Sequence, residues 1–102
     1  MKFKGEVHYV LSREAPKELV DELHEIVKVL NEEVLAKGVT VPEEGARILE
    51  YKLADEKTIV FLLETGRRVR IDEAALRVRN WLAPQVGRKY RIGIREIILK
   101  NG

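Results

Sequence analysis

Apolar and polar residues alternate over residues 2–11, which predicts a strand with one buried face. We expect the buried face of this strand to carry Phe3, Val7, Tyr9 and Leu11. Near the end of the chain, residues 89–99 predict another strand, but their apolar positions change phase partway along it. A β-bulge near Arg95-Glu96 would account for that change, because a bulge inserts one unpaired residue into a strand.

Two further strands are predicted in the middle of the chain, over residues 46–53 and 57–64. The first alternates between apolar and charged positions, and the second is almost wholly apolar, as expected for a central strand. Only Ala54, Asp55 and Glu56 separate the two. A connection this short favours an antiparallel hairpin.

Apolar residues recur at helical spacing from Leu19 to Val34, and acidic residues occupy the opposite side. This pattern predicts an amphipathic helix of about six turns. Pro16 suits its first turn, where the missing N–H costs no hydrogen bond, and Lys37-Gly38 suits its end. The acidic side is interpreted as a solvated surface rather than as a pair of catalytic carboxylates.

A second helix is predicted over residues 72–86, where apolar residues again recur at helical spacing. Asp72 is a suitable N-cap, and Gly87 is expected to end the helix. Pro84 should distort the final turn, because proline lacks the backbone N–H that the helix needs.

The predicted order of elements is βαββαβ, which is the pattern of the ferredoxin-like α+β fold. In that fold two helices cover one face of an antiparallel sheet. Residues 1–102 contain no linker, repeat or low-complexity tract, so we expect a single domain. The uncovered face of the sheet must then be polar, or must contact another domain or chain.

Composition excludes several kinds of chemistry. The chain has no cysteine and two histidines, so we expect no disulfide and no metal site. No nucleotide-binding glycine loop or zinc-protease motif occurs, so we expect no cofactor, no catalytic residues and no enzyme activity. The absence of a membrane-spanning apolar run and of a signal peptide favours a cytoplasmic protein. Abundant Glu, Lys and Arg with a single Gln resemble the composition of thermophilic proteins.

The net charge of +2 conceals a strong asymmetry along the chain. Residues 1–65 hold nine Lys/Arg and fourteen Asp/Glu, a net charge of −5. Residues 66–102 hold ten Lys/Arg and three Asp/Glu, a net charge of +7, and eight of these ten cations are arginines. Arginine offers phosphate a planar fork of donors and stays charged, so this asymmetry favours an anionic partner such as RNA.

The candidate RNA-binding residues form two groups along the chain. One group lies just before and within the second predicted helix, and the other lies between the end of that helix and the last predicted strand or within that strand. The eight candidates are Arg67, Arg68, Arg70, Arg77, Arg88, Lys89, Arg91 and Arg95. The central strand lacks the aromatic signature of an RNA-recognition motif, so we expect contacts with phosphates and RNA shape rather than base stacking.

Two other interpretations stay open. The arginines could pair with the acidic first part of the chain, which would leave no cationic surface for RNA. Alternatively, the chain could be a protein-interaction or homodimerisation module that uses the open sheet face, since a fold alone assigns no function.

Three segments carry a family resemblance: Glu64–Arg70, Asp72–Arg79 and Gly87–Arg95. The opening segment Lys2–Glu6 and the segment Asn31–Gly38 are similar to the same family. They resemble the N-terminal tRNA-binding domain of the methanogen-type seryl-tRNA synthetases, which are archaeal, atypical class II enzymes. The resemblance implies binding of serine tRNA, whose long variable arm is its identity feature. It also implies that catalysis belongs to a separate, zinc-containing domain, which is a further candidate partner for the open sheet face.

Overall fold

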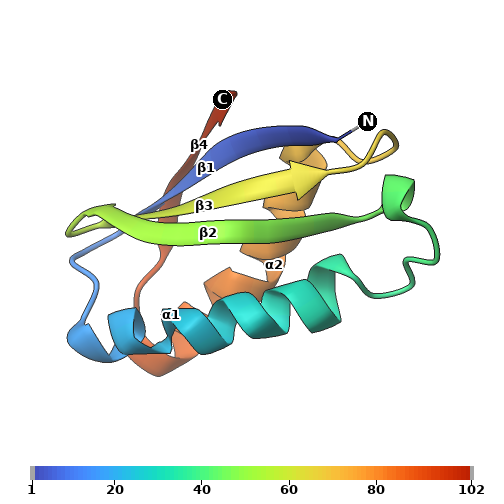
Figure 1. Ribbon diagram of the computed structural model, residues 1–102. Helices are drawn as coiled ribbons and strands as arrows, with labels where there is room; N and C mark the ends of the chain where they lie inside the picture. Colours follow the sequence, from blue (N-terminus) through green and yellow to red (C-terminus); the bar gives the residue numbers. More distant parts are fainter. Residues whose placement is uncertain (1, 102) are drawn as a thin grey trace.

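The computed structural model describes residues 2–101. Its strands and helices follow the predicted order (Figure 1): β1 (Phe3–Leu11), α1 (Lys17–Val29), β2 (Ala46–Asp55), β3 (Thr58–Thr65), α2 (Ile71–Tyr90) and β4 (Ile94–Asn101). A π-helical segment (Leu30–Leu35) continues α1, and a short 3-10 helix (Pro42–Glu44) precedes β2.

The four strands form one antiparallel sheet in the order β2-β3-β1-β4. β1 lies in its centre, between β3 and β4. Both helices lie on the same side of the sheet (Figure 1). The predicted ferredoxin-like α+β fold is therefore confirmed, and so is the hairpin between β2 and β3.

The core lies between the sheet and the helices. Tyr9 of β1 and Phe61 of β3 are fully buried, with ring centres 5.6 Å apart. The Tyr9 hydroxyl donates a hydrogen bond to the Ala75 carbonyl oxygen at 2.8 Å, which ties the sheet to α2. Burial raises the pKa of the Tyr9 hydroxyl well above its usual value, so it remains a donor.

The first helix differs from the prediction in its second half. Regular α-helix ends at Val29, and the π-helical segment replaces the expected last turns. Within that segment the Asn31 side chain donates to the Ile48 carbonyl oxygen (3.1 Å) and accepts from the Ile48 N–H (2.7 Å). Asn31 thus satisfies both backbone groups of one β2 residue, a tertiary contact that periodicity cannot reveal.

The start of α2 lies one residue before its predicted position. Asp72 does not cap it: the N-cap position is Arg70, and the Asp72 carboxylate accepts from the adjacent Glu73 N–H instead. Asp72 also forms an ion pair with the Arg70 guanidinium at 3.1 Å, and no side chain makes a capping hydrogen bond at the start of α2.

The end of α2 lies four residues beyond its predicted position. The helix continues through Pro84 and Gly87 to Tyr90, and Arg91 ends it in a left-handed conformation with φ of 56°. Core packing of the residues on both sides of Pro84 outweighs the one backbone hydrogen bond that proline removes. The prediction that Gly87 ends the helix was therefore wrong.

The last strand is shorter than predicted, because α2 takes up the residues before Arg91 and β4 begins only at Ile94. The register between β1 and β4 shifts between the pairs Val10–Glu96 and Leu11–Ile94, which leaves Arg95 unpaired. The predicted bulge near Arg95 is thus confirmed.

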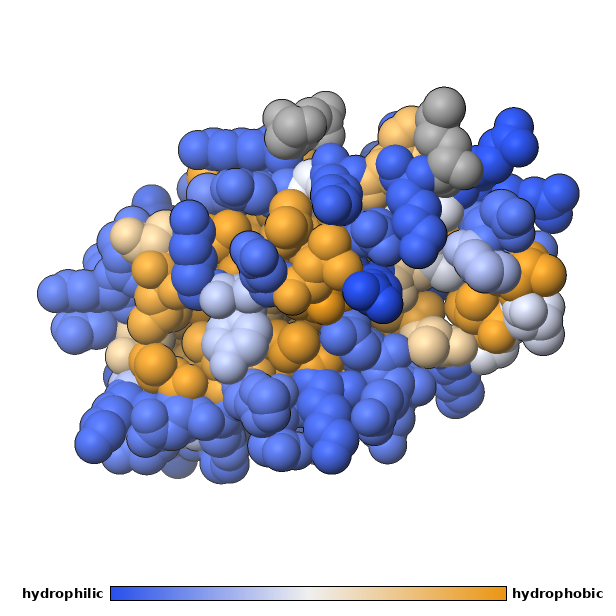
Figure 2. Space-filling view, viewed as in Figure 1, coloured by the Kyte–Doolittle hydropathy of each residue, from blue (hydrophilic) through white to orange (hydrophobic). Residues whose placement is uncertain are grey.

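The outer face of the sheet, opposite the helices, is mixed in character. By register it carries an apolar strip that includes Val60, Leu62 and Ile98, within a border of charged residues such as Glu6 and Lys100. Figure 2 views the molecule from the β2 side, where the outer surface of α1 is a hydrophilic band and apolar side chains lie above it. Within residues 2–101, no helix combines the length and apolar character that crossing a membrane requires.

Candidate nucleic-acid interface

The loop between β3 and α2 carries three of the predicted arginines and is fastened to the 3-10 helix beside it. The Gly66 N–H donates to the Gly45 carbonyl oxygen at 3.0 Å, and the Arg68 N–H donates to the Glu43 carbonyl oxygen at 2.9 Å. A Cβ atom on Gly66 would lie only 2.5 Å from the backbone of Glu43, so the two segments meet where only glycine fits. The loop therefore holds its arginines on a fixed backbone.

Four predicted residues lie together at this end of the molecule and are here named the loop cluster: Arg67, Arg68, Arg70 and Arg77. Three of them have nearby acidic partners. Arg68 is 3.4 Å from Glu44, and Arg77 is 3.0 Å from Glu73, one helical turn earlier. Exposed pairs of this kind are worth about 0–1 kcal/mol, so these guanidinium groups can exchange their carboxylate partners for phosphate at little cost.

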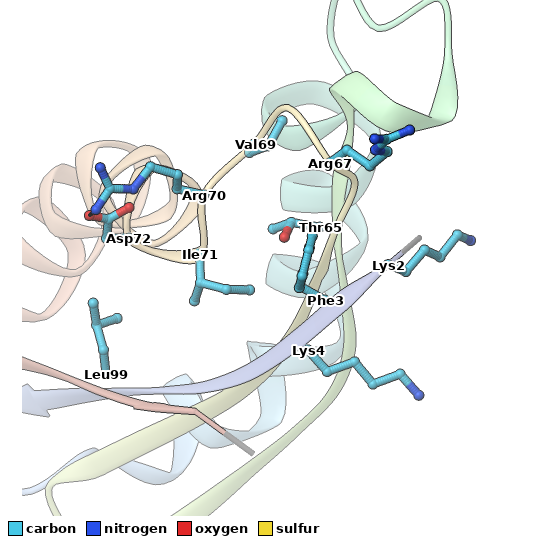
Figure 3. Close-up of a pocket in the computed structure, with 10 residues that line it drawn as sticks. All are labelled: Lys2, Phe3, Lys4, Thr65, Arg67, Val69, Arg70, Ile71, Asp72 and Leu99. Carbon is cyan, nitrogen blue, oxygen red and sulfur yellow. Dashed lines mark ion pairs between the residues drawn. The ribbon is translucent and has the colours of Figure 1, made fainter.

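Arg67 is the exposed guanidinium of the loop that has no acidic partner. Among residues 2–101, no carboxylate oxygen lies within 4.0 Å of it. Its side chain extends outward from the loop in the same direction as Lys2 (Figure 3). Of the loop cluster, Arg67 is thus the residue best placed to meet a phosphate.

A cleft of about 720 Å³ opens beside the loop cluster, between the start of α2 and the ends of β1 and β4. Arg67 and Lys2 border it on one side, and the Arg70–Asp72 pair borders it on the other (Figure 3). Phe3 lies in this cleft and is 47% exposed, which corrects the prediction that it belongs to the core. The helices that cover the rest of β1 do not reach its first residue, and the cleft takes their place.

Sequence reasoning missed the cations that the strands bring to the loop cluster. Phe3 of β1 pairs with Thr65 of β3, so the first residues of the chain lie beside the loop. Lys2 and Arg47 approach the Glu64 carboxylate, at 3.4 and 3.8 Å. The antiparallel hairpin pattern could have located them, because the start of one strand then meets the end of its neighbour.

The other four predicted residues form a separate group, here named the C-terminal cluster: Arg88, Lys89, Arg91 and Arg95. Lys89 contacts the Glu22 carboxylate of α1, which also accepts a hydrogen bond from the Tyr90 hydroxyl at 2.6 Å. These two donors hold the pKa of Glu22 below its usual value. Partial desolvation and the Glu22 carboxylate raise the pKa of Tyr90 to about 12.

The two clusters lie toward opposite ends of α2. At a rise of about 1.5 Å per residue, Arg88 is about 27 Å along the helix from Arg70 and about 16 Å from Arg77. The alternative that the cationic residues pair with the acidic first part of the chain holds in part. Within the described residues Arg68 pairs with Glu44 and Lys89 pairs with Glu22, whereas Arg70 and Arg77 pair with Asp72 and Glu73 beside them on α2.

The loop cluster and its surroundings suit the binding of an anionic partner. No group of three or more potential metal ligands gathers anywhere in residues 2–101. The four guanidinium groups of the loop cluster lie beside the exposed Phe3 ring and the cleft, and cationic groups, aromatic rings and concave surfaces are what proteins use to hold phosphates and nucleobases.

Comparison with protein families agrees with this chemistry. A family described as a tRNA-binding domain matches residues 1–101. The fold is similar to one chain of a crystal structure of A. aeolicus tRNASec in complex with M. kandleri SerRS. That match has a TM-score of 0.83 and 42% sequence identity, and covers 94% of this chain and 18% of the other.

Similar sequences are type-2 serine–tRNA ligases of methanogenic archaea. The protein from Methanopyrus kandleri is 42% identical over 98 residues, covering 95% of this chain and 18% of that protein. The one from Methanothermobacter thermautotrophicus is 34% identical over 99 residues, covering 95% and 19%. The chain thus spans less than a fifth of the length of these relatives, and the resemblance seen in its sequence is confirmed.

Proposed function

The chain belongs to the family of tRNA-binding domains, and from that premise we propose that it binds serine tRNA as a non-catalytic domain. The specific tRNA is inferred from the serine–tRNA ligases that it resembles over 95% of its length. The observation that carries the proposal is the loop cluster, in which three arginines lie on a loop fixed by backbone hydrogen bonds and the fourth, Arg77, lies on the adjoining α2.

The contacts are expected to involve mainly the RNA backbone. Guanidinium groups bind phosphate oxygens in a forked geometry, and such contacts set the orientation of a protein on RNA. Their strength depends on salt, because each neutralised phosphate releases counterions. Affinity should therefore fall steeply as salt rises, by roughly 0.7–0.9 logarithmic units of affinity per logarithmic unit of salt for each phosphate neutralised.

The test compares two arginines that carry the same charge in different places. Arg67→Ala removes the unpaired guanidinium of the loop cluster, whereas Arg79→Ala removes an exposed arginine of α2 outside both clusters. Binding of serine tRNA is titrated at several salt concentrations. Arg67→Ala should weaken binding and lower the salt slope by about one, and Arg79→Ala should change neither.

Two results would overturn the proposal. One is the absence of serine tRNA binding by the wild-type chain at low salt. The other is an equal loss of affinity in the Arg67→Ala and Arg79→Ala variants, since net charge alone would then explain the binding. A transfer RNA for another amino acid, titrated in parallel, tests whether the preference is for serine tRNA.

The outer sheet face favours a second role, as a contact surface for another domain or a second copy. Its apolar strip includes Ile98, which is 36% exposed on the edge strand β4. Exposed apolar residues on an edge strand promote association between chains. Sedimentation equilibrium tests the homodimer: a monomer at all protein concentrations would leave contact with another domain as the use of this face.

A further inference from the structure

We propose that the cleft beside the loop cluster binds one unpaired nucleotide of the RNA, with its base against Phe3 and its phosphate near Arg67 and Lys2. This inference rests on the proposed function and adds a base-contacting site to it. It also revises the expectation that the domain avoids base stacking, because that expectation considered only the central strand.

The floor of the cleft is apolar and accessible. Phe3 is 47% exposed and Leu99 is 45% exposed, although neighbouring strand residues on the same face are buried. Figure 3 shows Phe3, Leu99 and Ile71 directed into the same space between the sheet and the start of α2. The cleft thus offers an aromatic ring and two aliphatic side chains to a flat, partly apolar group.

The border of the cleft selects an anionic occupant. Arg67 and Lys2 lie on one side, and Arg70 lies on the other, where it pairs with Asp72. Lys2 and Arg70 are largely exposed and reach solvent around the opening. Four cationic residues line the cleft (Lys2, Lys4, Arg67 and Arg70), against the lining carboxylate of Asp72 and the Glu64 carboxylate that pairs with Lys2. The excess of positive charge favours a nucleotide over an apolar peptide.

A buried hydroxyl group beside the cleft has no hydrogen-bond partner. Thr65 lines the cleft, and its Oγ1 is the one buried side-chain oxygen or nitrogen without a partner among the described side chains of residues 2–100. Buried polar groups normally have a hydrogen-bond partner, so the Thr65 hydroxyl is a group that the fold itself leaves unsatisfied beside the cleft. It lies beneath the surface of the cleft, so the base site is assigned to Phe3 and the bordering cations rather than to this hydroxyl.

The occupant must be unpaired. Bases within an A-form duplex are stacked on their neighbours, and their faces are not available to a side chain. Nucleotides in loops and bulges can turn outward and stack on an aromatic ring. The cleft volume of about 720 Å³ lies within the range of about 300–1,000 Å³ that is typical of ligand sites.

Three short RNA probes separate base binding from phosphate binding. The first is a fully paired duplex, the second is the same duplex with a single bulged nucleotide, and the third carries an abasic bulge at that place. The wild-type chain should bind the bulged duplex about tenfold more tightly than either of the others, which corresponds to one stacked base.

The variants test whether Phe3 carries that preference. Phe3→Leu keeps an apolar side chain and should reduce the tenfold preference to less than twofold, while Phe3→Tyr should retain it. Tyr51→Leu removes an aromatic that is similarly exposed (38%) on β2, outside the cleft, and should change nothing. Because Phe3 is half exposed, circular dichroism should show all variants folded.

The outcomes distinguish the two proposals. If serine tRNA binds but the bulged and abasic duplexes bind equally well, the base site is refuted and the proposed function stands. The same conclusion follows if Phe3→Leu keeps the full preference, and the cleft would then be left for a protein segment. If the wild-type chain binds none of the RNAs at low salt, the proposed function itself fails.

Discussion

Replacing Gly66 with alanine should destabilise the protein, although alanine usually improves on glycine. The added Cβ would lie 2.5 Å from the Glu43 backbone, whereas non-bonded carbon atoms normally stay about 3.5–4.0 Å apart. The loop and the 3-10 helix must therefore separate by about 1 Å. Backbone atoms lie on both sides of this contact, so no side chain can rotate away to relieve it.

The expected magnitude follows from the hydrogen bonds across that contact. Gly66 donates to Gly45 and Arg68 donates to Glu43, and each such bond contributes about 1 kcal/mol. Losing both costs about 2 kcal/mol, and the lower entropy of the unfolded chain with alanine offsets about 0.4–1 kcal/mol of this. We expect a net loss of about 1–2 kcal/mol, or a melting temperature lower by about 4–16 °C.

Gly87→Ala is the matched control, because the same substitution there should have the opposite sign. Gly87 lies within α2, and the nearest atom to its added Cβ is 3.9 Å away. Alanine in a helix is favoured over glycine by about 0.5–1 kcal/mol. Urea unfolding followed by the fluorescence of Trp81 measures both variants. If Gly66→Ala proved as stable as the wild type, the contact between the loop and the 3-10 helix would not be tight.

Three further substitutions test single contacts. Asn31→Ala should lower the free energy of unfolding by about 1–3 kcal/mol in urea titrations, because it leaves both backbone groups of Ile48 without their partner. Glu22→Gln should lower the melting temperature at pH 7 but not at pH 2.5. The lowered pKa of Glu22 means that its bond to Lys89 stabilises the fold above a carboxyl pKa of about 4.3 and is lost as the pH falls. Tyr9→Phe should cost about 0.5–1.5 kcal/mol, measured by thermal unfolding, through loss of its hydrogen bond to α2.

Much of the fold could be predicted from local patterns. Alternation located β1, and the short connection located the hairpin of β2 and β3. The bulge at Arg95 was visible as a change of phase. These features depend on which residues face the core, and the spacing of apolar residues along the chain indicates those residues.

The errors arose where tertiary contacts outweigh local preference. Pro84 and Gly87 are strong signals for the end of a helix, yet α2 continues through both because its inner residues are held in the core. Within the π-helical segment, Asn31 bonds to Ile48, seventeen residues away. No pattern within one segment contains that information.

The candidate site was predicted only in part, for a related reason. Charge along the chain identified the arginines but could not show that α2 is long enough to separate them into two clusters. It also gave no reason to consider Phe3, which alternation places in the core. Its exposure depends on where the helix layer stops, and that limit is set by packing of the whole domain.

The separation of the clusters implies that they are not equivalent toward RNA. Glu22 lies against Lys89, so the acidic outer face of α1 borders the C-terminal cluster and opposes the approach of phosphate there. The loop cluster has no such neighbour on α1 within ion-pairing distance among residues 2–101. Arg88→Ala should therefore change the affinity for serine tRNA by less than twofold, measured beside Arg67→Ala at the same salt concentration.

A variant that carries both Arg67→Ala and Arg88→Ala tests whether one RNA contacts both ends of α2, when its affinity for serine tRNA is compared with that of each single variant. Sites roughly 30 Å apart do not interact directly, so their effects on binding free energy should add. If Arg88→Ala weakened binding as much as Arg67→Ala, and the double variant lost the sum of both, the RNA would extend along the whole of α2. The acidic face of α1 would then have to face away from the bound RNA, and the loop cluster would not be the main RNA-binding group.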